Sequence, residues 1–320
     1  MKRPLSIGCI IVLVLFLASC GQPKDGQLKS VGLLVPETIN DQVWGTNGYK
    51  GMLKIQSTYN RDVFYKEHTD SERAVKQAVK EFSKQGVNLI FGHGEEYASY
   101  FNKLGKQYPD IHFVSFNGDA KGDNVTTVNF KGKAMGFFGG MVAGKMTKSK
   151  KVGVIAAYDW QPEVKGFLDG VKFQQPNAQV EMKVVKSWDD KKTARQYADE
   201  MIKSGVDVVY PAGDGFNVSI IEKLREKGIY AIGYVADQSD LGQDTVLTST
   251  VQHVDTLYEL VAKDYDKGTL KTGNLMYDFD NKVISLGKFS PLVDKAYQKE
   301  IQHYINEYKR TGKLPDQQQK

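Results

Sequence analysis

The feature that most constrains the fold is a repeated alternation of short apolar runs with segments of helical periodicity. Runs rich in β-branched and aromatic residues predict strands at 31–35, 62–65, 87–92, 111–117, 125–130, 152–156, 180–185, 206–213 and 229–235. Apolar residues recur at helical spacing over 71–85, 95–107, 131–146, 163–174, 190–204 and 216–227. Nearly continuous apolar strands followed by helices are typical of parallel sheets covered on both faces. The sequence therefore predicts an α/β fold.

The alternation occurs twice, which predicts two similar lobes. The order of elements that starts at residue 31 starts again at 152, and the glycine-rich strand end FGHG (91–94) is matched by PAGDG (211–215). Each repeat has about 120 residues, the size of one doubly wound domain. Ligands of such sheets bind outside the carboxyl ends of the strands. We therefore expect the site in the loops 36–46, 92–96, 117–122, 157–163, 187–190, 213–217 and 235–240.

The three tryptophans of the chain indicate the same region. Trp44, Trp160 and Trp188 all lie in these loops or beside them. Trp44 stands in NDQVWGTNGYKGM (40–52), where glycines and short polar residues leave open surroundings for a large flat ring. Packing is the more common role of a tryptophan at a strand end, and a stacking surface for a planar ligand is the alternative.

The N-terminus is typical of an exported protein. Lys2 and Arg3 precede an apolar run from Ile7 to Leu17, which is too short to span a bilayer. LASCG (17–21) resembles the lipobox of bacterial lipoproteins, in which the cysteine is acylated, with palmitate or a similar chain. We expect a signal peptide at 1–19, lipidation at Cys20 and a polar tether over 20–29, with a plain secretory peptide as the alternative. The protein would then be held on the extracytoplasmic face of the cell membrane.

Charge and cysteine content exclude several classes of partner and site. Loss of Lys2 and Arg3 with the signal reduces the 43 basic residues to 41, against 38 acidic ones, a net charge of about +3. This charge is too small to favour nucleic acid, and no helix-turn-helix or basic stripe is visible, so no direct nucleic-acid partner is expected. Cys9 leaves with the signal, so disulfides and cysteine-based metal sites are excluded.

No motif predicts catalysis, a cofactor or a metal. G-x-S-x-G is missing from the sequence, and the five histidines lack metal-ligand spacing: His68, His93, His112, His253 and His303. GGMVAGKM (139–146) resembles a Walker A loop but ends in Met where a hydroxyl is required. Glycines at 136, 140 and 144 instead predict a smooth helix face that allows close packing. We therefore expect a protein that is not an enzyme.

Longer segments resemble the basic membrane lipoprotein (BMP) family of nucleoside-binding substrate-binding lipoproteins. The opening motif NDQVWGTNGYKGM is similar to the family pattern Asp-x-Ser-Phe-Asn, with Asp41 at the Asp position and Trp44 at the stacking Phe. The likeness continues in 108–114, 124–146, 151–172, 205–218 and 231–242 and so covers the whole mature chain. INDQVWG, FFGGM, WQPEV, YPAGDG and DQSDLG with TVLTSTVQ resemble in particular the subgroup of positive regulators of competence.

The resemblance implies a type I periplasmic-binding-protein architecture, in which two doubly wound parallel-sheet lobes are joined by a three-strand hinge. We expect an N-lobe of 30–128 plus 247–275, a C-lobe of 129–246 plus 276–312 and a frayed tail at 313–320. It also implies a nucleoside held in the interlobe cleft between aromatic rings, with side chains bound to the ribose and the base edge. The expected ligand-binding residues are Asp41, Trp44, Gly92, His93, Trp160, Trp188, Asp214, Phe216, Asp237, Gln238 and Gln252.

Three positions depart from the family pattern. Gly45 stands where the family has an Asn that bonds the base edge, and Val235 stands where it has an Asp that bonds the ribose. Gln252 stands where the family has a later Lys. The ligand is therefore a nucleoside-like or another aromatic small molecule, or the cleft has lost its ligand. His93, Glu95 and Asp214 are candidates for a changed specificity, and solvated loop positions are the alternative. A transporter or signalling protein is the expected further partner. The second functional hypothesis is a positive regulator of competence gene transcription, which acts indirectly if Cys20 is acylated and directly only if the signal is not used.

Overall fold

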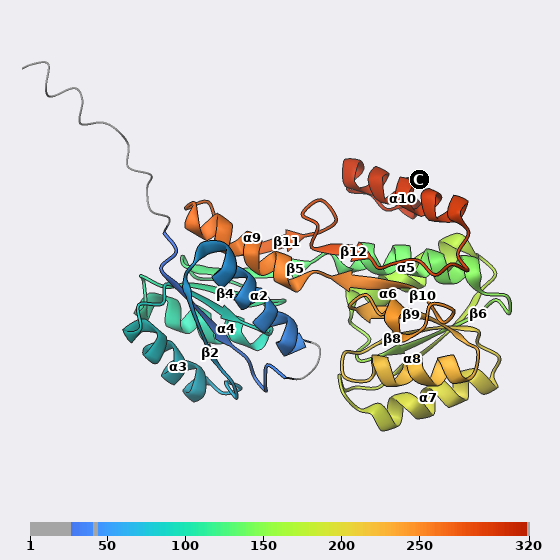
Figure 1. The fold of residues 1–320 in the computed structure, drawn as a ribbon, viewed down its shortest axis with the longest axis horizontal. Coiled ribbons are helices and arrows are strands. Elements are labelled where there is room, and N and C mark those ends of the chain that lie inside the picture. Colours follow the sequence, from blue (N-terminus) through green and yellow to red (C-terminus); the bar gives the residue numbers. More distant parts are fainter. Residues whose placement is uncertain (1–26, 41–43, 319–320) are drawn as a thin grey trace, which may run out of the picture.

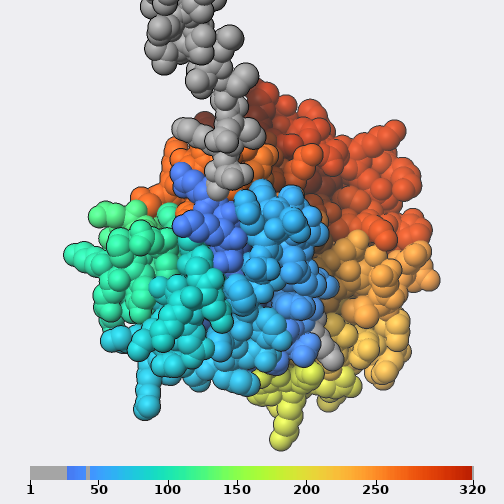
Figure 2. Space-filling view, turned by 60° about the vertical axis from the view of Figure 1, so that its left-hand side comes forward, coloured from blue at the N-terminus to red at the C-terminus, as the bar shows by residue number. Residues whose placement is uncertain are grey.

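The structure is a computed structural model of the chain, and it describes residues 27–40 and 44–318. The signal peptide, Cys20 and Asp41 lie outside the described residues. Two lobes lie side by side, and the C-terminal helix α10 (Lys295–Thr311) lies along the second of them (Figure 1). In the space-filling view, α10 (red) and α7 (Lys191–Lys203, yellow) lie at opposite ends of that lobe (Figure 2).

The first lobe is built on a six-stranded parallel sheet. The strand order is β11-β5-β4-β3-β1-β2. Its strands are β1 (Ser30–Leu34), β2 (Asp62–Lys66), β3 (Leu89–Gly92), β4 (His112–Phe116), β5 (Val125–Phe130) and β11 (Gly273–Tyr277). Helices α2 (Trp44–Tyr59) and α9 (Val254–Asp266) cover one face, and α3 (Glu72–Lys84) and α4 (Glu96–Leu104) cover the other. Leu33 and Leu34 show this two-sided burial, because they pack into the clusters on opposite faces.

The second lobe repeats the arrangement. Its strand order is β12-β10-β9-β8-β6-β7, and β12 alone among these described strands pairs antiparallel. Its strands are β6 (Lys151–Ala156), β7 (Gln179–Val184), β8 (Val208–Ala212), β9 (Tyr230–Val235), β10 (Val246–Gln252) and β12 (Ile284–Leu286). Helices α5 (Gly132–Met146) and α6 (Pro162–Gln174) cover one face, and α7 and α8 (Asn217–Glu226) cover the other. The predicted two-lobe α/β fold is confirmed.

The chain crosses between the lobes three times, which forms the hinge. The crossings follow β5, β10 and β11. Lys131 N donates to Tyr277 O at 2.9 Å and His253 N donates to Val283 O at 2.8 Å, so the crossing segments are bonded to one another. The structure corrects one expectation, because residues 247–252 were assigned to the first lobe and β10 belongs to the second sheet.

Glycines bring α5 and α6 into backbone contact. A Cβ on Gly136, Gly140, Gly166 or Gly170 would lie well inside contact distance of a carbonyl oxygen of the facing helix. Any larger residue would force the helices apart. The interpretation of the glycine stripe as a packing surface is therefore confirmed.

Both ends of the described chain differ from expectation. Tether residue Leu28 is buried, and its N–H donates to Asp266 Oδ1 at 3.0 Å, so residues 27–29 are tied to the first lobe. The tail expected to fray from 313 instead forms α11 (Pro315–Gln318). Leu314 is 4% exposed there, because its apolar side chain packs into the hydrophobic core.

Candidate ligand-binding cleft

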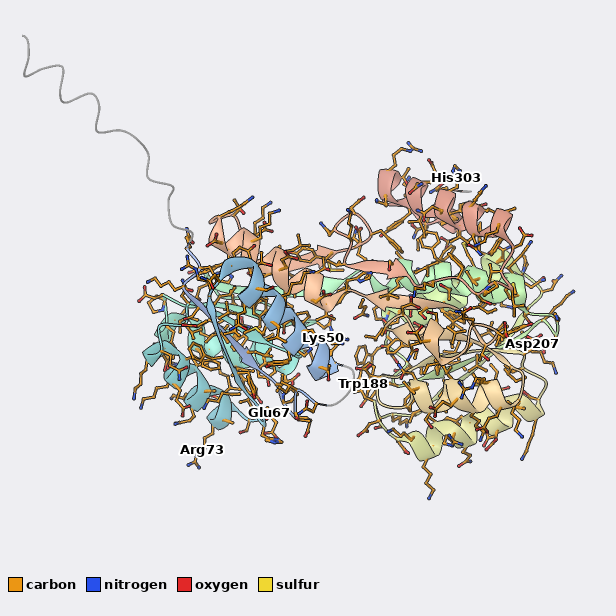
Figure 3. The ribbon with its side chains drawn as sticks, viewed as in Figure 1. Lys50, Glu67, Arg73, Trp188, Asp207 and His303 are labelled. Atoms are coloured by element: carbon orange, nitrogen blue, oxygen red, sulfur yellow. The ribbon has the colours of Figure 1, made fainter. Side chains whose placement is uncertain are left out.

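A cavity of about 1460 Å³ opens between the lobes at the carboxyl ends of their strands. The first lobe contributes the loops after β1, β3 and β4, and the second contributes the loops after β6, β7 and β8 and the end of β9. Hinge residues around Asn129 and Gln252 and the C-terminal residues Tyr308, Gly312, Leu314 and Gln317 also line it. All three tryptophans lie on its walls. Trp188 lies on the side of the second lobe that faces the first (Figure 3).

Trp44 is held rigidly on the first-lobe wall. Its indole stacks on the His93 ring, with centroids 4.3 Å apart and an interplanar angle of 13°. Phe116 meets the indole edge-on at 5.7 Å. The indole N–H donates to His93 O at 3.2 Å. One face of the indole is thus occupied by His93, and the ring is partly exposed in the cleft.

His93, on which the Trp44 indole stacks, is buried, with only 1% of its surface exposed. Its Nε2 lies 2.7 Å from Trp44 O, and its Nδ1 lies 2.9 Å from Tyr258 Oη. A carbonyl oxygen only accepts, so Nε2 carries the proton and donates, and in the neutral ring the Tyr258 hydroxyl donates to Nδ1. Gly48 makes room for this ring, since a Cβ there would lie 2.9 Å from it.

The second-lobe wall presents exposed aromatic rings. Trp160 is 57% exposed and Trp188 is 38% exposed. Tyr158 stacks on Trp160 at 5.5 Å and meets Trp188 at 5.3 Å with an angle of 63°. The two indoles lie 6.1 Å apart at 77°. These rings support one another and leave aromatic faces open to the cleft.

A buried polar network lies at the start of α6. Glu163 is 6% exposed, and its Oε1 accepts from Tyr234 Oη at 2.8 Å and from Gln161 Nε2 at 3.0 Å. Gln161 Nε2 also reaches Ala212 O at 3.2 Å. Burial raises the pKa of Tyr234 well above its usual value, and the Glu163 charge raises it further. Tyr234 is therefore a hydroxyl donor at neutral pH.

The cleft walls carry more acidic than basic side chains. Seven carboxylates line it, namely Glu37, Glu95, Glu96, Glu163, Asp189, Asp214 and Glu222, against three lysines, Lys131, Lys133 and Lys191. Burial raises the pKa of Glu96, and the neighbouring Glu95 adds to the shift. Two of the lysines already have partners, since Lys131 Nζ lies 2.9 Å from Asp278 and Lys133 Nζ lies 2.9 Å from Asp169.

The geometry has the features of a solute-binding protein, and comparison with known proteins gives the family. Residues 28–318 match the Bmp family, described as "ABC transporter substrate-binding protein PnrA-like". The chain belongs to the Bmp family. It is 53% identical to the transcriptional activator protein Med of Bacillus subtilis, over 96% of this chain and 97% of that protein. It is 27% identical to a purine-binding protein of Brucella abortus, over 75% of this chain and 67% of that one.

Solved structures agree with this assignment. A transcriptional activator of the comK gene from Bacillus halodurans superposes with a TM-score of 0.85 and 48% identity, covering 89% of this chain and 99% of that one. A solute-binding protein of an ABC transporter system from Conexibacter woesei matches with a TM-score of 0.74 over 90% of this chain and 98% of its own, and its 19% identity shows the fold alone. The family and fold are those of substrate-binding proteins, and the resemblance to the competence-regulator subgroup is confirmed.

The structure places some of the predicted ligand-binding residues on the cleft wall and others away from it. Those on the cleft wall are Trp44, His93, Trp160, Trp188, Asp214 and Gln252. Gly92 and Phe216 lie in the interior instead. Gly92 packs under Tyr97, where a Cβ would not fit, and Phe216 is fully buried between α8 and the second sheet.

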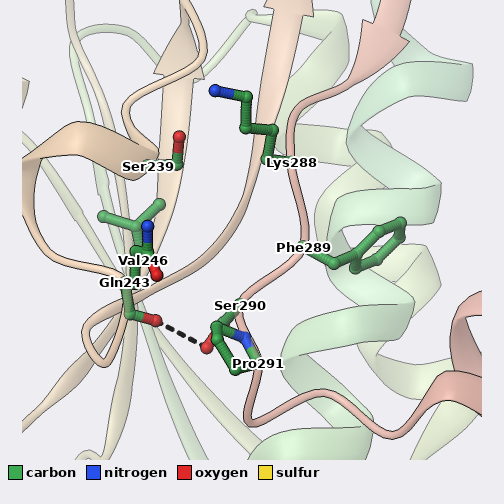
Figure 4. A pocket seen from close by; sticks show the side chains of 7 residues that line it. All are labelled: Ser239, Gln243, Val246, Lys288, Phe289, Ser290 and Pro291. Atoms are coloured by element: carbon green, nitrogen blue, oxygen red, sulfur yellow. Dashed lines mark hydrogen bonds between the residues drawn. The ribbon is translucent and has the colours of Figure 1, made fainter.

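Asp237 and Gln238 have structural hydrogen bonds outside the cleft wall. Gln238 is 8% exposed, and its Oε1 accepts from Tyr234 N at 2.8 Å. Asp237 accepts from Ser239 N and from Lys288 N, each at 3.2 Å. They lie beside a separate hollow of about 110 Å³ next to β10, where Ser290 Oγ donates to Gln243 O at 2.6 Å (Figure 4).

Val235 marks a strained point in the cleft wall. It occupies the position where the Bmp-family pattern has a ribose-binding Asp, and its φ is 65°. Positive φ is uncommon for any residue with a side chain and is an outlier for a β-branched one. Such strain persists where the surrounding structure fixes it and is concentrated at functional sites.

Sequence reasoning missed Glu163, Tyr234, Asn129 and Asn217 as cleft residues. The signal for Glu163 was WQPEV (160–164), in which an acidic residue follows a proline at a helix start next to a cleft tryptophan. Within the described ranges, no group of three or more His, Cys, Asp or Glu side chains is suited to a metal ion. None of the helices in the described part of the chain has the length and apolarity that a membrane span requires.

Proposed function

We propose that this Bmp-family protein binds a planar, nucleoside-like small molecule between Trp44 on the first lobe and Trp160 and Trp188 on the second. The observation that carries the proposal is the placement of all three tryptophans on the two walls of one cleft. Stacking of a base on an aromatic side chain contributes about 1–3 kcal/mol and tolerates different bases. The purine-binding relative from Brucella abortus supports the ligand class.

The cleft volume implies movement on binding. Pockets for small molecules are typically about 300–1000 Å³, and this cleft has about 1460 Å³. The lobes would therefore approach one another around the hinge until rings from both walls contact the ligand. The side chain that would bind the ribose is replaced by Val235, so a neutral nucleoside loses a charge-assisted hydrogen bond, which is worth roughly 1.5–3 kcal/mol.

The test is calorimetry of the protein lacking residues 1–20 against a panel of nucleosides and nucleobases, with tryptophan fluorescence recorded in parallel. We expect heat and quenching for at least one purine compound. Trp44→Ala should remove most of the affinity, and Trp44→Phe should retain it. Tyr65→Ala is the matched control, because Tyr65 is an exposed ring of the first lobe that does not line the cleft. Absence of heat and of a thermal shift across the panel would refute the proposal.

A gain-of-function variant tests the same site independently. Val235→Asp restores the carboxylate that the family pattern places there, and Asp adopts positive φ more readily than Val. We expect this variant to bind adenosine more tightly and 2′,3′-dideoxyadenosine no better. Equal gains for both compounds would mean that Val235 does not face the ribose.

The protein would act from the extracytoplasmic face of the membrane through acylated Cys20. The lipobox LASCG and the short polar tether support this placement. Globomycin should block processing at Cys20, and Cys20→Ser should release the protein from the membrane fraction. Recovery of a cytoplasmic protein that retains residues 1–19 would overturn the placement.

The second candidate function is positive regulation of competence gene transcription. It is favoured by 53% identity to Med and by the similarity to the comK activator structure. An anchored protein would exert such an effect indirectly, through a transporter or signalling partner. A competence-gene reporter in a strain with Trp44→Ala separates the two roles. Unchanged reporter activity would show that regulation does not depend on the ligand.

A further inference from the structure

Glu163 is a buried carboxylate in the cleft wall with one oxygen left to bind. Both printed hydrogen bonds to it, from Tyr234 and Gln161, reach Oε1. Across residues 27–40 and 44–318, no donor forms a hydrogen bond with Oε2, and no basic side chain forms an ion pair with Glu163. Charges with so little exposure are normally paired.

The helix start does not fully account for this carboxylate. Glu163 lies in the first turn of α6, where the helix dipole favours negative charge. However, neither carboxylate oxygen accepts from a described backbone N–H, and Pro162 at the first helical position has no N–H to offer. The helix dipole therefore lowers the free-energy cost of burying the Glu163 charge, but Oε2 can still accept a hydrogen bond.

The surroundings favour a cation. Seven carboxylates and three lysines line the cleft, and Lys131 and Lys133 are paired with Asp278 and Asp169. Trp160, three residues before Glu163, and Trp188 expose indole faces, and these attract cations through the ring quadrupole. Helix N-termini around the cleft oppose this field within their first turns, and the N-terminus of α6 does so at Glu163, where it offsets part of the carboxylate charge.

We propose that the ligand carries a positive charge, as a protonated amine or a cationic ring nitrogen, and that Glu163 Oε2 is its counter-ion. This inference rests on the proposed function, because it names the charge of the molecule held in the same cleft. It also gives a reason for the replacement of polar nucleoside-binding side chains by Gly45, Val235 and Gln252. Binding energy comes from the ion pair and the indole faces instead of from bonds to a ribose.

The experiment compares compounds of one shape and different charge by calorimetry. Adenosine is the neutral probe, 1-methyladenosine carries charge on the ring, 5′-amino-5′-deoxyadenosine carries it on the sugar, and adenosine 5′-monophosphate is the anion. We expect at least one of the two cations to bind about tenfold more tightly than adenosine, the factor expected for one charge-assisted bond. The anion should bind most weakly.

Glu163→Gln assigns the effect to this residue, since the amide oxygen can still accept from Tyr234 and Gln161. It should abolish the preference for the cation over adenosine, with both affinities measured on the same variant, and Glu163→Asp should retain part of the preference. Glu222→Gln is the matched control, because it removes the same charge from an exposed position on the cleft wall and should keep the preference. Thermal unfolding confirms that each variant is folded.

The outcomes separate this inference from the proposed function. If adenosine binds as well as both cations, or if Glu163→Gln keeps the preference, the inference is wrong and the proposed function stands. A loss of preference in Glu222→Gln equal to that in Glu163→Gln would assign the effect to the general field of the cleft and also overturn the role of Glu163. No binding of any probe would reject both proposals.

Discussion

The two walls of the cleft use tryptophan in opposite ways. On the first lobe, Trp44 is stacked on His93 and hydrogen-bonded to the His93 carbonyl, so its orientation is fixed before a ligand arrives. On the second lobe, Trp160 and Trp188 are exposed, and among the described residues no acceptor is bonded to either indole N–H. The difference indicates one preorganised surface and one adaptable surface, so a planar ligand would dock on the first lobe and be covered by the second.

The helix pairs nearest the hinge show a second contrast between the lobes. In the second lobe, α5 and α6 meet backbone to backbone through glycines. In the first lobe, α2 and α9 meet through a side chain, since a Cβ on Gly51 would lie 2.6 Å from the Tyr258 ring. A ring can tilt, whereas two helix backbones cannot approach further. The second lobe should therefore tolerate fewer substitutions at its helix crossing.

The largest expected effect follows from this contrast. Gly140→Ala places a methyl group against the Phe167 carbonyl at the centre of the α5–α6 crossing. We expect a loss of about 3 kcal/mol in the free energy of unfolding, at the upper end for overpacking, because a helix backbone cannot move aside as a side chain can. Urea denaturation measures this loss.

Two alanine variants control for the chemistry of the substitution. In Gly144→Ala, the new Cβ would lie 3.0 Å from Val171 O, near the end of the helix crossing. This variant should lose about 1 kcal/mol or less in unfolding free energy, because alanine also has a higher helix propensity than glycine. Gly51→Ala in the first lobe should fall between the two. Equal losses at Gly140 and Gly51 would remove the contrast between the helix pairs.

Acid should weaken the first lobe at a histidine of its sheet. Burial lowers the pKa of His112 from 6.5 to about 4, and its Nε2 bonds Thr126 Oγ1 at 2.8 Å. The unfolded chain takes up a proton near pH 6.5 and the folded chain does so only near pH 4. The stability from neutral His112 is therefore present above pH 6.5 and is lost as the pH falls to 4, a change of about 3 kcal/mol.

His112→Gln tests this dependence, because glutamine donates to Thr126 without titrating. Its unfolding free energy should fall less than that of the wild type between pH 6.5 and 4. Hydrogen exchange should locate the difference in the first sheet, because His253, whose pKa burial also lowers and whose Nε2 lies 2.8 Å from Ser285 Oγ in β12, is the same in both proteins. Parallel pH profiles for the two proteins would contradict the expectation.

The sequence predicted the elements better than the site. Each predicted strand from 31–35 to 229–235 was found within about two residues, because hydrophobic periodicity is a local property. β10 was assigned to the wrong lobe, since a strand that leads into a hinge has no local sign of which sheet it joins. Leu28 and Leu314 were misjudged for the same reason, because their burial depends on distant partners.

Among the candidate site residues, those with a local sequence signal were also predicted better than those whose position depends on the fold. The tryptophans were found because large rings at strand ends are visible in a sequence. Phe216 was taken for a cleft ring, although it faces the core, because the direction of a side chain after a strand is set by the turn and not by composition. Glu163 was missed because its partner Tyr234 is 71 residues away along the chain.

Alanine substitutions test the contrast between the tryptophans directly. Trp44→Ala should lower ligand affinity by about 1–3 kcal/mol. It should also destabilise the free protein by about 2 kcal/mol, because the ring is half-buried against His93 and Phe116. Trp160→Ala should lower affinity within the same range and leave the stability of the free protein almost unchanged. Calorimetry and urea denaturation of both variants give the comparison, which fails if Trp160→Ala destabilises as much as Trp44→Ala.

The smallest expected effect concerns the ion pairs that join the same two helix pairs. Lys54 on α2 lies 3.2 Å from Asp255 and 3.1 Å from Glu259 on α9, and Lys133 on α5 lies 2.9 Å from Asp169 on α6. All these side chains are partly exposed, so each pair contributes about 0–1 kcal/mol. Lys54→Met should cost about 0.5 kcal/mol, and Lys133→Met should cost less, because the glycine contact already fixes the spacing of α5 and α6. Urea denaturation at low and high salt is the measurement, and salt should reduce the Lys54 effect. A larger loss for Lys133→Met would mean that the ion pair, and not the backbone contact, sets the crossing in the second lobe.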